Sequence, residues 1–173
     1  MVSDVLLFSG GVDSAYLLET VTPEDGIGVA LFVDYGQPAA KQERRAVSVM
    51  ARRSNWMIKT VSIAGMPLGE MAAGVGMHIV PARNVWLISI AAAFGRHVWI
   101  GCAPQDREYE DCRLSFLSLM DDALGAIGGQ VHWSNTTRDK RVALLKDRDV
   151  IQYCWSCYGS GPEPCGECKS CTQ

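Results

Sequence analysis

The residues best suited to chemistry in this chain lie near its beginning, in the segment Phe8-Ser-Gly-Gly-Val-Asp-Ser14. The apolar run 5–8 predicts a short buried strand, and residues 15–19 predict the opening of a helix. A glycine turn between a strand and a helix directs free N–H groups and the positive end of the helix dipole at one point. Ser9 and Ser14 add hydroxyl donors, and Asp13 either orients the turn or holds Mg²⁺. The segment predicts a phosphate or pyrophosphate site, and the alternative is a glycine-rich turn without a ligand.

The type of phosphate loop can be narrowed by what the turn contains. It has no lysine, which excludes a Walker motif, and it lacks the Gly-x-Gly-x-x-Gly pattern of dinucleotide-binding folds. Ser-Gly-Gly-x-Asp-Ser after a strand resembles the pyrophosphate loop of the ATP pyrophosphatases, which cleave ATP to AMP and pyrophosphate. The resemblance implies that the ATP-binding residues are Phe8, Ser9, Gly10, Gly11, Val12, Asp13, Ser14, Ala15, Tyr16, Leu17 and Leu18. The candidate catalytic residues are Ser9, Asp13, Ser14 and Lys140, the last at the start of a helix expected over 140–146.

A second group of reactive residues is the cysteine-rich tail. Five of the seven cysteines fall at positions 154, 157, 165, 168 and 171, in paired short spacings. Four thiolates suit tetrahedral zinc in a closed structural site, so one of the five is spare. Cys165, Cys168 and Cys171 are three expected ligands, and the fourth is Cys154 or Cys157. The shorter loop to be closed favours Cys157. An iron–sulfur cluster is the rival interpretation, because Cys-x2-Cys-x2-Cys also occurs in ferredoxin-like runs.

Composition bounds the class of protein. The 173 residues predict one compact unit, divided here into an ATP-binding part over 1–152 and a cysteine-rich segment over 153–173. A net charge of −3 gives no sign of a nucleic-acid-binding surface, and no apolar stretch is long enough for a membrane span. No signal peptide is recognised, and grouped cysteines without an export signal favour a metal site in a reducing compartment over disulfides. We therefore expect a cytoplasmic protein that acts on small molecules, with no nucleic-acid or membrane partner.

The remaining pattern alternates strands with helices. Further strands are predicted over 29–33, 56–63, 97–101 and 131–133, and helices over 39–53, 85–94, 114–127 and 140–146, with a Gly- and Met-rich loop or lid over 66–77. This alternation predicts an α/β fold, a doubly wound, mainly parallel sheet with helices on both faces and the cysteine tail appended. The polar residues that follow the first, second and fourth strands would then meet at one sheet edge, which predicts a single active site.

Several polar residues are candidates for substrate binding at that edge. Arg83 and Asn84 open a helix, where they either grip a planar, oxygen-rich ligand or serve as a cap and a solvated arginine. Asp106, Asp111 and Arg113 belong to a dense polar loop after the fourth strand. Carboxylate and amide side chains suit the donor and acceptor groups of a planar ligand, and a guanidinium would hold a carboxylate or phosphate. The alternative is that Asn84 caps its helix and that Asp111 and Arg113 form a surface pair.

Taken together, the motifs resemble those of the 7-cyano-7-deazaguanine synthases, over nearly the whole chain. The resemblance rests on the loop at 8–14, Asp34-Tyr-Gly-Gln37 with Glu43 downstream, Val80-Pro-Ala-Arg-Asn84, Tyr109-Glu-Asp-Cys-Arg113, and Trp155-Ser-Cys-Tyr158 before the last three cysteines. It implies an adenine nucleotide alpha hydrolase-like fold, a homodimer, and zinc bound by Cys157, Cys165, Cys168 and Cys171. The chain departs from the family in a shortened segment over 64–79 and in Glu110, which replaces a proline.

The activity implied by the resemblance is an ATP-dependent ligase. It would convert 7-carboxy-7-deazaguanine and ammonia to 7-cyano-7-deazaguanine (preQ0) for queuosine-type 7-deazapurines, through adenylated intermediates and with ATP, Mg²⁺ and Zn²⁺. A variant that stops at 7-amido-7-deazaguanine is one alternative. The others are a nucleic-acid-modifying, thiolase-like enzyme with an iron–sulfur tail, and an inactive nucleotide-binding module whose zinc tail mediates assembly.

Overall fold

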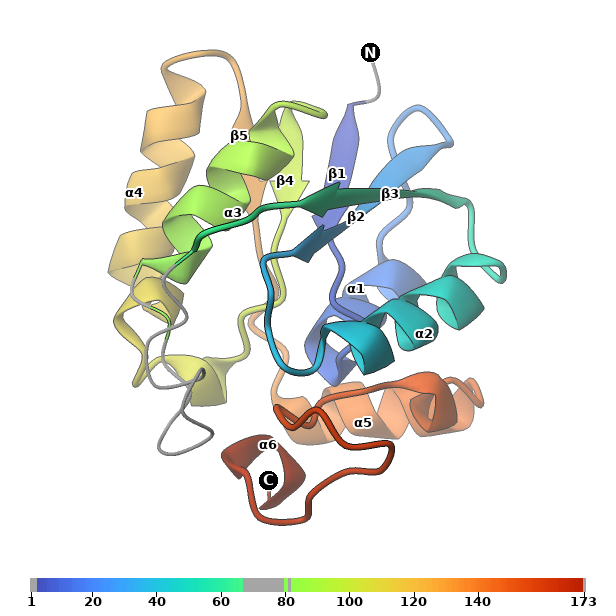
Figure 1. Cartoon of the computed structure of the whole chain (residues 1–173). Coiled ribbons are helices and arrows are strands. Elements are labelled where there is room, and N and C mark those ends of the chain that lie inside the picture. Colours follow the sequence, from blue (N-terminus) through green and yellow to red (C-terminus); the bar gives the residue numbers. More distant parts are fainter. Residues whose placement is uncertain (1–2, 67–79, 81, 173) are drawn as a thin grey trace.

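The fold is a parallel sheet of five strands with helices on both of its faces (Figure 1). The computed structural model describes residues 3–66, 80 and 82–172. The strands are β1 (Asp4–Leu7), β2 (Gly28–Asp34), β3 (Trp56–Ser62), β4 (His97–Trp99) and β5 (Gln130–His132). The helices are α1 (Val12–Thr20), α2 (Ala40–Ala51), α3 (Arg83–Ala92), α4 (Leu114–Gly125), α5 (Arg138–Asp147) and α6 (Lys169–Thr172), with short 3-10 turns at Pro104–Asp106, Glu110–Cys112 and Ile151–Tyr153.

The strand order is β3-β2-β1-β4-β5, and all the strand pairs are parallel. The chain winds outward from β1 to β3 and then returns to add β4 on the other side of β1. The order therefore reverses between β1 and β4. In doubly wound sheets, ligands bind outside the carboxyl ends of the strands at such a point. The topology thus places the loop that follows β1 next to the loop that follows β4.

Two hydrophobic clusters bury the two faces of the sheet. Val5 and Leu7 of β1 face a cluster that includes Ile88 of α3 and Leu117 of α4. Leu6 and Phe8 face the other cluster, which includes residues of α1, α2 and α5 such as Leu145. Alternate side chains of one strand point to opposite faces, so β1 is buried on both. Figure 1 shows the same division, with α3 and α4 on one side of the sheet and α1, α2 and α5 on the other.

The predicted α/β class with a parallel sheet is confirmed, and each predicted strand and helix is present with small differences at its ends. The expected helix over 140–146 begins earlier, at Arg138. The predicted loop or lid over 66–77 and the shortened segment over 64–79 fall largely outside the described residues. Within the part of the chain that the structure describes, no helix combines the length and the apolar character required to cross a bilayer.

Candidate functional site

The glycine loop after β1 is shaped as the sequence predicts. Gly11 is the N-cap of α1 in an extended conformation, and no side chain caps the helix there. Gly10 has φ +79°, and a Cβ on it would lie 2.8 Å from the Cβ of Ala46 in α2, so only glycine fits this turn. The hydroxyl oxygens of Ser9 and Ser14 lie 3.4 Å apart beside the helix N-terminus. Backbone N–H groups and two hydroxyls therefore converge where an anion would be stabilised.

Asp13 is held in place by two arginines of α5. Its Oδ1 accepts a hydrogen bond from Arg141 Nη1 and its Oδ2 one from Arg138 Nη2, each at 2.9 Å. The Arg141 side chain is 0% exposed, and its other N–H groups donate to the backbone oxygens of Thr136, Cys102 and Ser134. Among the described hydrogen-bond partners of Arg141, Asp13 is therefore the only charged one, and the others are neutral backbone carbonyl oxygens.

Arg138 joins the glycine loop to the loop that follows β4. Its guanidinium also contacts the Asp106 carboxylate, at 3.2 and 3.4 Å. Burial raises the pKa of Asp106, although the positive charge of Arg138 opposes that effect. Burial alone would lower the pKa of Arg138, but Asp13 and Asp106 together raise it. The close approach of the two loops depends on Gly101, where a Cβ would lie 3.0 Å from backbone atoms of Asp13 and Ser14.

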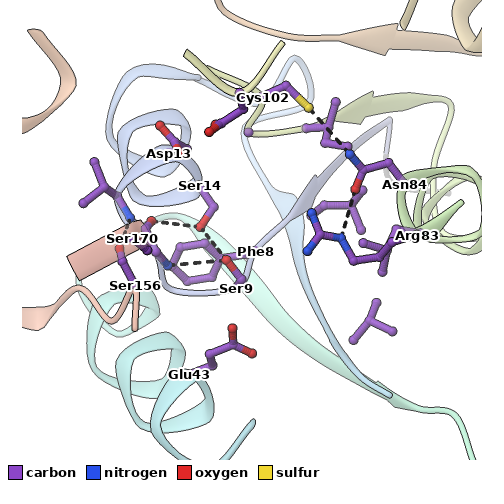
Figure 2. A pocket seen from close by; sticks show the side chains of 18 of the residues that line it. Phe8, Ser9, Asp13, Ser14, Glu43, Arg83, Asn84, Cys102, Ser156 and Ser170 are labelled. Carbon is purple, nitrogen blue, oxygen red and sulfur yellow. Dashed lines mark hydrogen bonds between the residues drawn. The ribbon is translucent and has the colours of Figure 1, made fainter. Parts of the chain in front are cut away.

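The opposite wall of the site comes from β2, α2 and the start of α3. Arg83 Nε donates to Asn84 Oδ1 at 3.4 Å, and burial raises the pKa of the Tyr35 hydroxyl despite the nearby Arg83 guanidinium. Glu43 of α2 accepts a hydrogen bond of 2.7 Å from Gln37. Figure 2 shows Ser9, Ser14 and Asp13 on one side of the pocket, with Arg83 and Asn84 on the other. The two walls therefore present hydroxyls and N–H groups on one side, and a guanidinium and an amide on the other.

A pocket of about 220 Å³ lies between these walls. Its floor is apolar and includes Leu7 of β1, Leu31 of β2 and Ile100, which directly follows β4. An apolar floor with a few convergent polar groups is the usual form of a small-molecule site. The sequence-predicted residues that line it are Phe8, Ser9, Gly11, Val12, Asp13, Ser14, Arg83, Asn84 and Asp106.

The tail brings four cysteines together. The sulfur atoms of Cys157, Cys165, Cys168 and Cys171 all lie within 4.8 Å of one another. Zinc with Zn–S bonds of about 2.3 Å holds its four sulfurs about 3.8 Å apart, so this thiol set fits the ion. Backbone N–H groups of Gly159 and Cys165 donate to the Cys157 sulfur at 3.3 Å. Hydrogen bonds from backbone N–H groups also lower the pKa of the Cys165 thiol to about 6, which favours the thiolate that a metal requires.

The tail also packs against the glycine loop. The Trp155 N–H donates to the Gly10 carbonyl at 2.9 Å, and the Val12 N–H donates to the Ser156 hydroxyl at 3.4 Å across 144 residues of sequence. Ser170 of α6 lines the pocket. The tail also contacts the loop that follows β4, because Lys169 forms an ion pair with Glu108 of that loop. The cysteine-rich segment is therefore a wall of the pocket as well as a candidate metal site.

Comparison with known proteins agrees with this geometry. The model of the family described as "Queuosine biosynthesis protein QueC" matches residues 3–173. The chain belongs to the QueC family. Among QueC relatives, proteins named 7-cyano-7-deazaguanine synthase from Campylobacter concisus and from a Nitratiruptor species are 31% and 27% identical to it. Each alignment covers 96% of this chain and 89% of the relative. One from Thermoplasma volcanium is 27% identical, over 96% of this chain and 82% of the relative.

In this QueC chain, two hydrogen bonds link Asn84 to Asp111. The Asn84 side chain is buried and donates to the Asp111 backbone oxygen at 2.8 Å, while the Asp111 carboxylate accepts from the Asn84 backbone N–H at 3.1 Å. Asp111 therefore caps the start of α3 from outside the pocket lining and positions Asn84. The Asn84 amide also lies 3.4 Å from the sulfur of Cys112.

Other sequence-predicted residues lie away from the QueC pocket. Arg113 is half-exposed and pairs with Glu110 at 3.8 Å, and Lys140 is exposed on α5. The residues absent from the pocket lining are Gly10, Ala15, Tyr16, Leu17, Leu18, Asp111, Arg113 and Lys140. Sequence reasoning missed Arg138 and Arg141, for which the sequence carries no motif. It also gave no role to Glu43, although that residue was part of the resemblance.

Proposed function

We propose that this chain is an ATP-dependent ligase that converts 7-carboxy-7-deazaguanine and ammonia to 7-cyano-7-deazaguanine. One observation carries the proposal: in a member of the QueC family, a glycine loop of ATP pyrophosphatase type and the Arg83–Asn84 wall share a single pocket. The relatives named for this product extend over most of the chain.

A carboxylate lacks a good leaving group, so the reaction needs activation. In our proposal, the substrate carboxylate attacks the α-phosphorus of ATP, which gives an acyl adenylate and pyrophosphate. Ammonia displaces AMP to form the amide, and adenylation of the amide oxygen followed by loss of AMP leaves the nitrile. In both halves the protein positions reactants and stabilises developing charge.

The two walls support different parts of this chemistry. Ser9, Ser14 and the first N–H groups of α1 would hold the departing pyrophosphate, while Arg138 and Arg141 keep Asp13 oriented. Arg83 would hold the carboxylate or phosphate, and Asn84 the edge of the deazapurine. Mg²⁺ would supply Lewis-acid stabilisation of the phosphates, and the two carboxylates of the pocket that share Arg138, Asp13 and Asp106, would hold it. Zinc, bound by the four clustered cysteines, would have a structural role.

Mass spectrometry of the products formed from 7-carboxy-7-deazaguanine, ATP and ammonium tests the proposal. We expect the nitrile, with AMP and pyrophosphate released. Accumulation of the amide alone would indicate the shorter reaction, and absence of pyrophosphate release would indicate an inactive nucleotide-binding module. Ser14→Ala should lose most of the pyrophosphate release, whereas Ser48→Ala, which removes a hydroxyl from α2 outside the pocket, should retain it.

The location, the oligomeric state and the partners of the enzyme are also proposals. We infer a cytoplasmic enzyme that works as a homodimer on small molecules without a nucleic-acid partner. Light scattering coupled to size-exclusion chromatography measures the oligomeric state directly, and a monomeric mass would refute the dimer.

A further inference from the structure

Glu43 lies in the pocket without a role in the chemistry described so far. It belongs to the first turn of α2 and lines the pocket beside the glycine loop. The contact is close, because a Cβ on Gly10 would lie 3.2 Å from the backbone oxygen of Glu43. Figure 2 shows the carboxyl group projecting into the pocket near Ser9, on the side away from Asn84. The carboxyl group of Glu43 therefore shares one pocket with the glycine loop and Arg83.

One oxygen of Glu43 is fixed and the other is available. Gln37 is buried, and its Oε1 accepts the Tyr35 N–H at 2.9 Å. Its Nε2 donates to the Val33 carbonyl at 3.2 Å and to Glu43 Oε2 at 2.7 Å. Both hydrogens of the Gln37 Nε2 group are therefore engaged, and one of them holds Glu43 Oε2 in place. Among the described residues, Oε1 of Glu43 makes no hydrogen bond or ion pair, so this oxygen is oriented and open to a small donor in the pocket.

Burial, more than the nearby charges, sets the protonation of Glu43. Burial raises the pKa of Glu43 to about 7, although the hydrogen bond from Gln37 and the positive charge of Arg83 oppose this, and Asp34 adds to it. A carboxyl group of this kind exchanges protons readily at neutral pH, as a general base must. Arg83 and Glu43 line the same pocket, and because Arg83 would bind the substrate anion, the carboxylate of Glu43 is left for a cation.

We propose that Glu43 binds the nitrogen nucleophile as ammonium and takes a proton from it before the attack on the acyl adenylate. Ammonium donates to Oε1, one proton passes to Glu43, and the nitrogen lone pair attacks the acyl carbon. The bond from that carbon to the AMP oxygen breaks, and its electron pair leaves with AMP. Loss of a second proton from nitrogen gives the neutral amide, so ammonium and acyl adenylate yield amide, AMP and two protons. This assignment rests on the proposed function.

The test separates adenylation from amine transfer. Glu43→Gln keeps the size of the side chain and removes the base, and Glu24→Gln, an exposed residue far from the pocket, is the matched control. Exchange of pyrophosphate into ATP, driven by 7-carboxy-7-deazaguanine without ammonium, reports on adenylation alone. Hydroxylamine, already unprotonated at neutral pH, reports on amine transfer that does not need the base.

We expect Glu43→Gln to retain the exchange and the hydroxylamine reaction within a few-fold of the parent. Its kcat/KM for ammonium should fall at least about 100-fold, the low end for loss of a general base. An equal loss with both amines would assign Glu43 a structural role, as a brace for Gln37, and overturn the proposal. Unchanged use of ammonium would also overturn it. If the parent itself shows no exchange, the proposed function fails, and the ammonium site fails with it.

Discussion

Substitution of Asp13 by alanine tests whether this residue acts on the ligand alone or also holds the fold together. Asp13 is the acidic partner of Arg141, whose side chain is 0% exposed. Loss of one member of a buried ion pair leaves an uncompensated charge and costs about 3–5 kcal/mol. A domain of this size is stable by roughly 5–15 kcal/mol. The loss should lower Tm by about 6–20 °C, since 1 kcal/mol corresponds to about 2–4 °C at this chain length.

A matched control lies on the same helix. Glu19 of α1 is 20% exposed, close to the 16% of Asp13, but its partner Arg148 is 44% exposed. Glu19→Ala should therefore cost less than about 1 kcal/mol. Urea unfolding followed by tryptophan fluorescence measures both variants at equal zinc loading. Equal losses in the two variants would refute the argument, and partial recovery of stability in the Asp13→Ala/Arg141→Met double variant would support it.

Three further expectations concern the metal, the buried acid and the amide. Cys157→Ser should lose one zinc per chain together with stability, whereas Cys154→Ser should keep both; elemental analysis decides, and a brown protein that contains iron would contradict zinc. Because the folded state raises the pKa of Glu43 to about 7 from 4.5, the parent binds an extra proton and loses stability between these pH values as pH rises. The glutamine of Glu43→Gln does not titrate, so the stability of the variant relative to the parent should increase by up to about 3 kcal/mol as pH rises across that range. Urea midpoints of the two proteins that change equally with pH would refute this. Asn84→Ala should lower stability by about 1–3 kcal/mol and raise KM for the deazapurine, with KM for ATP unchanged; an equal rise in both KM values would argue against base recognition.

What the sequence predicted correctly is local. The glycine loop is one strand–turn–helix unit, and the cysteines cluster within a short stretch of chain, so both could be read from spacing. The parallel sheet followed from the alternation of strands and helices. These features depend on neighbouring residues, and the family resemblance agreed with the shorter loop in favouring Cys157 over Cys154.

What the sequence could not predict depends on how α5 is rotated against α1. Arg138 and Arg141 reach Asp13 from 125 and 128 residues away, and Lys140, two positions from Arg138, is exposed. A helix with so few apolar residues gives no clear sign of its buried face, so any of its four cations fitted the pattern equally well. The link between Asp111 and Asn84 could not be predicted for a related reason. In one of its hydrogen bonds the acceptor is the backbone oxygen of Asp111, which the type of residue does not reveal.

The hydrogen bond from Trp155 to Gly10 also bears on the order in which the protein becomes active. Synthesis runs from the N-terminus, so the sheet and the glycine loop leave the ribosome before residues 155–171 do. The contact between the two therefore forms late and spans most of the chain. A chain interrupted before the cysteines would carry an assembled sheet but lack one wall of its pocket. Zinc uptake by the tail would then be the step that separates a folded chain from a competent one.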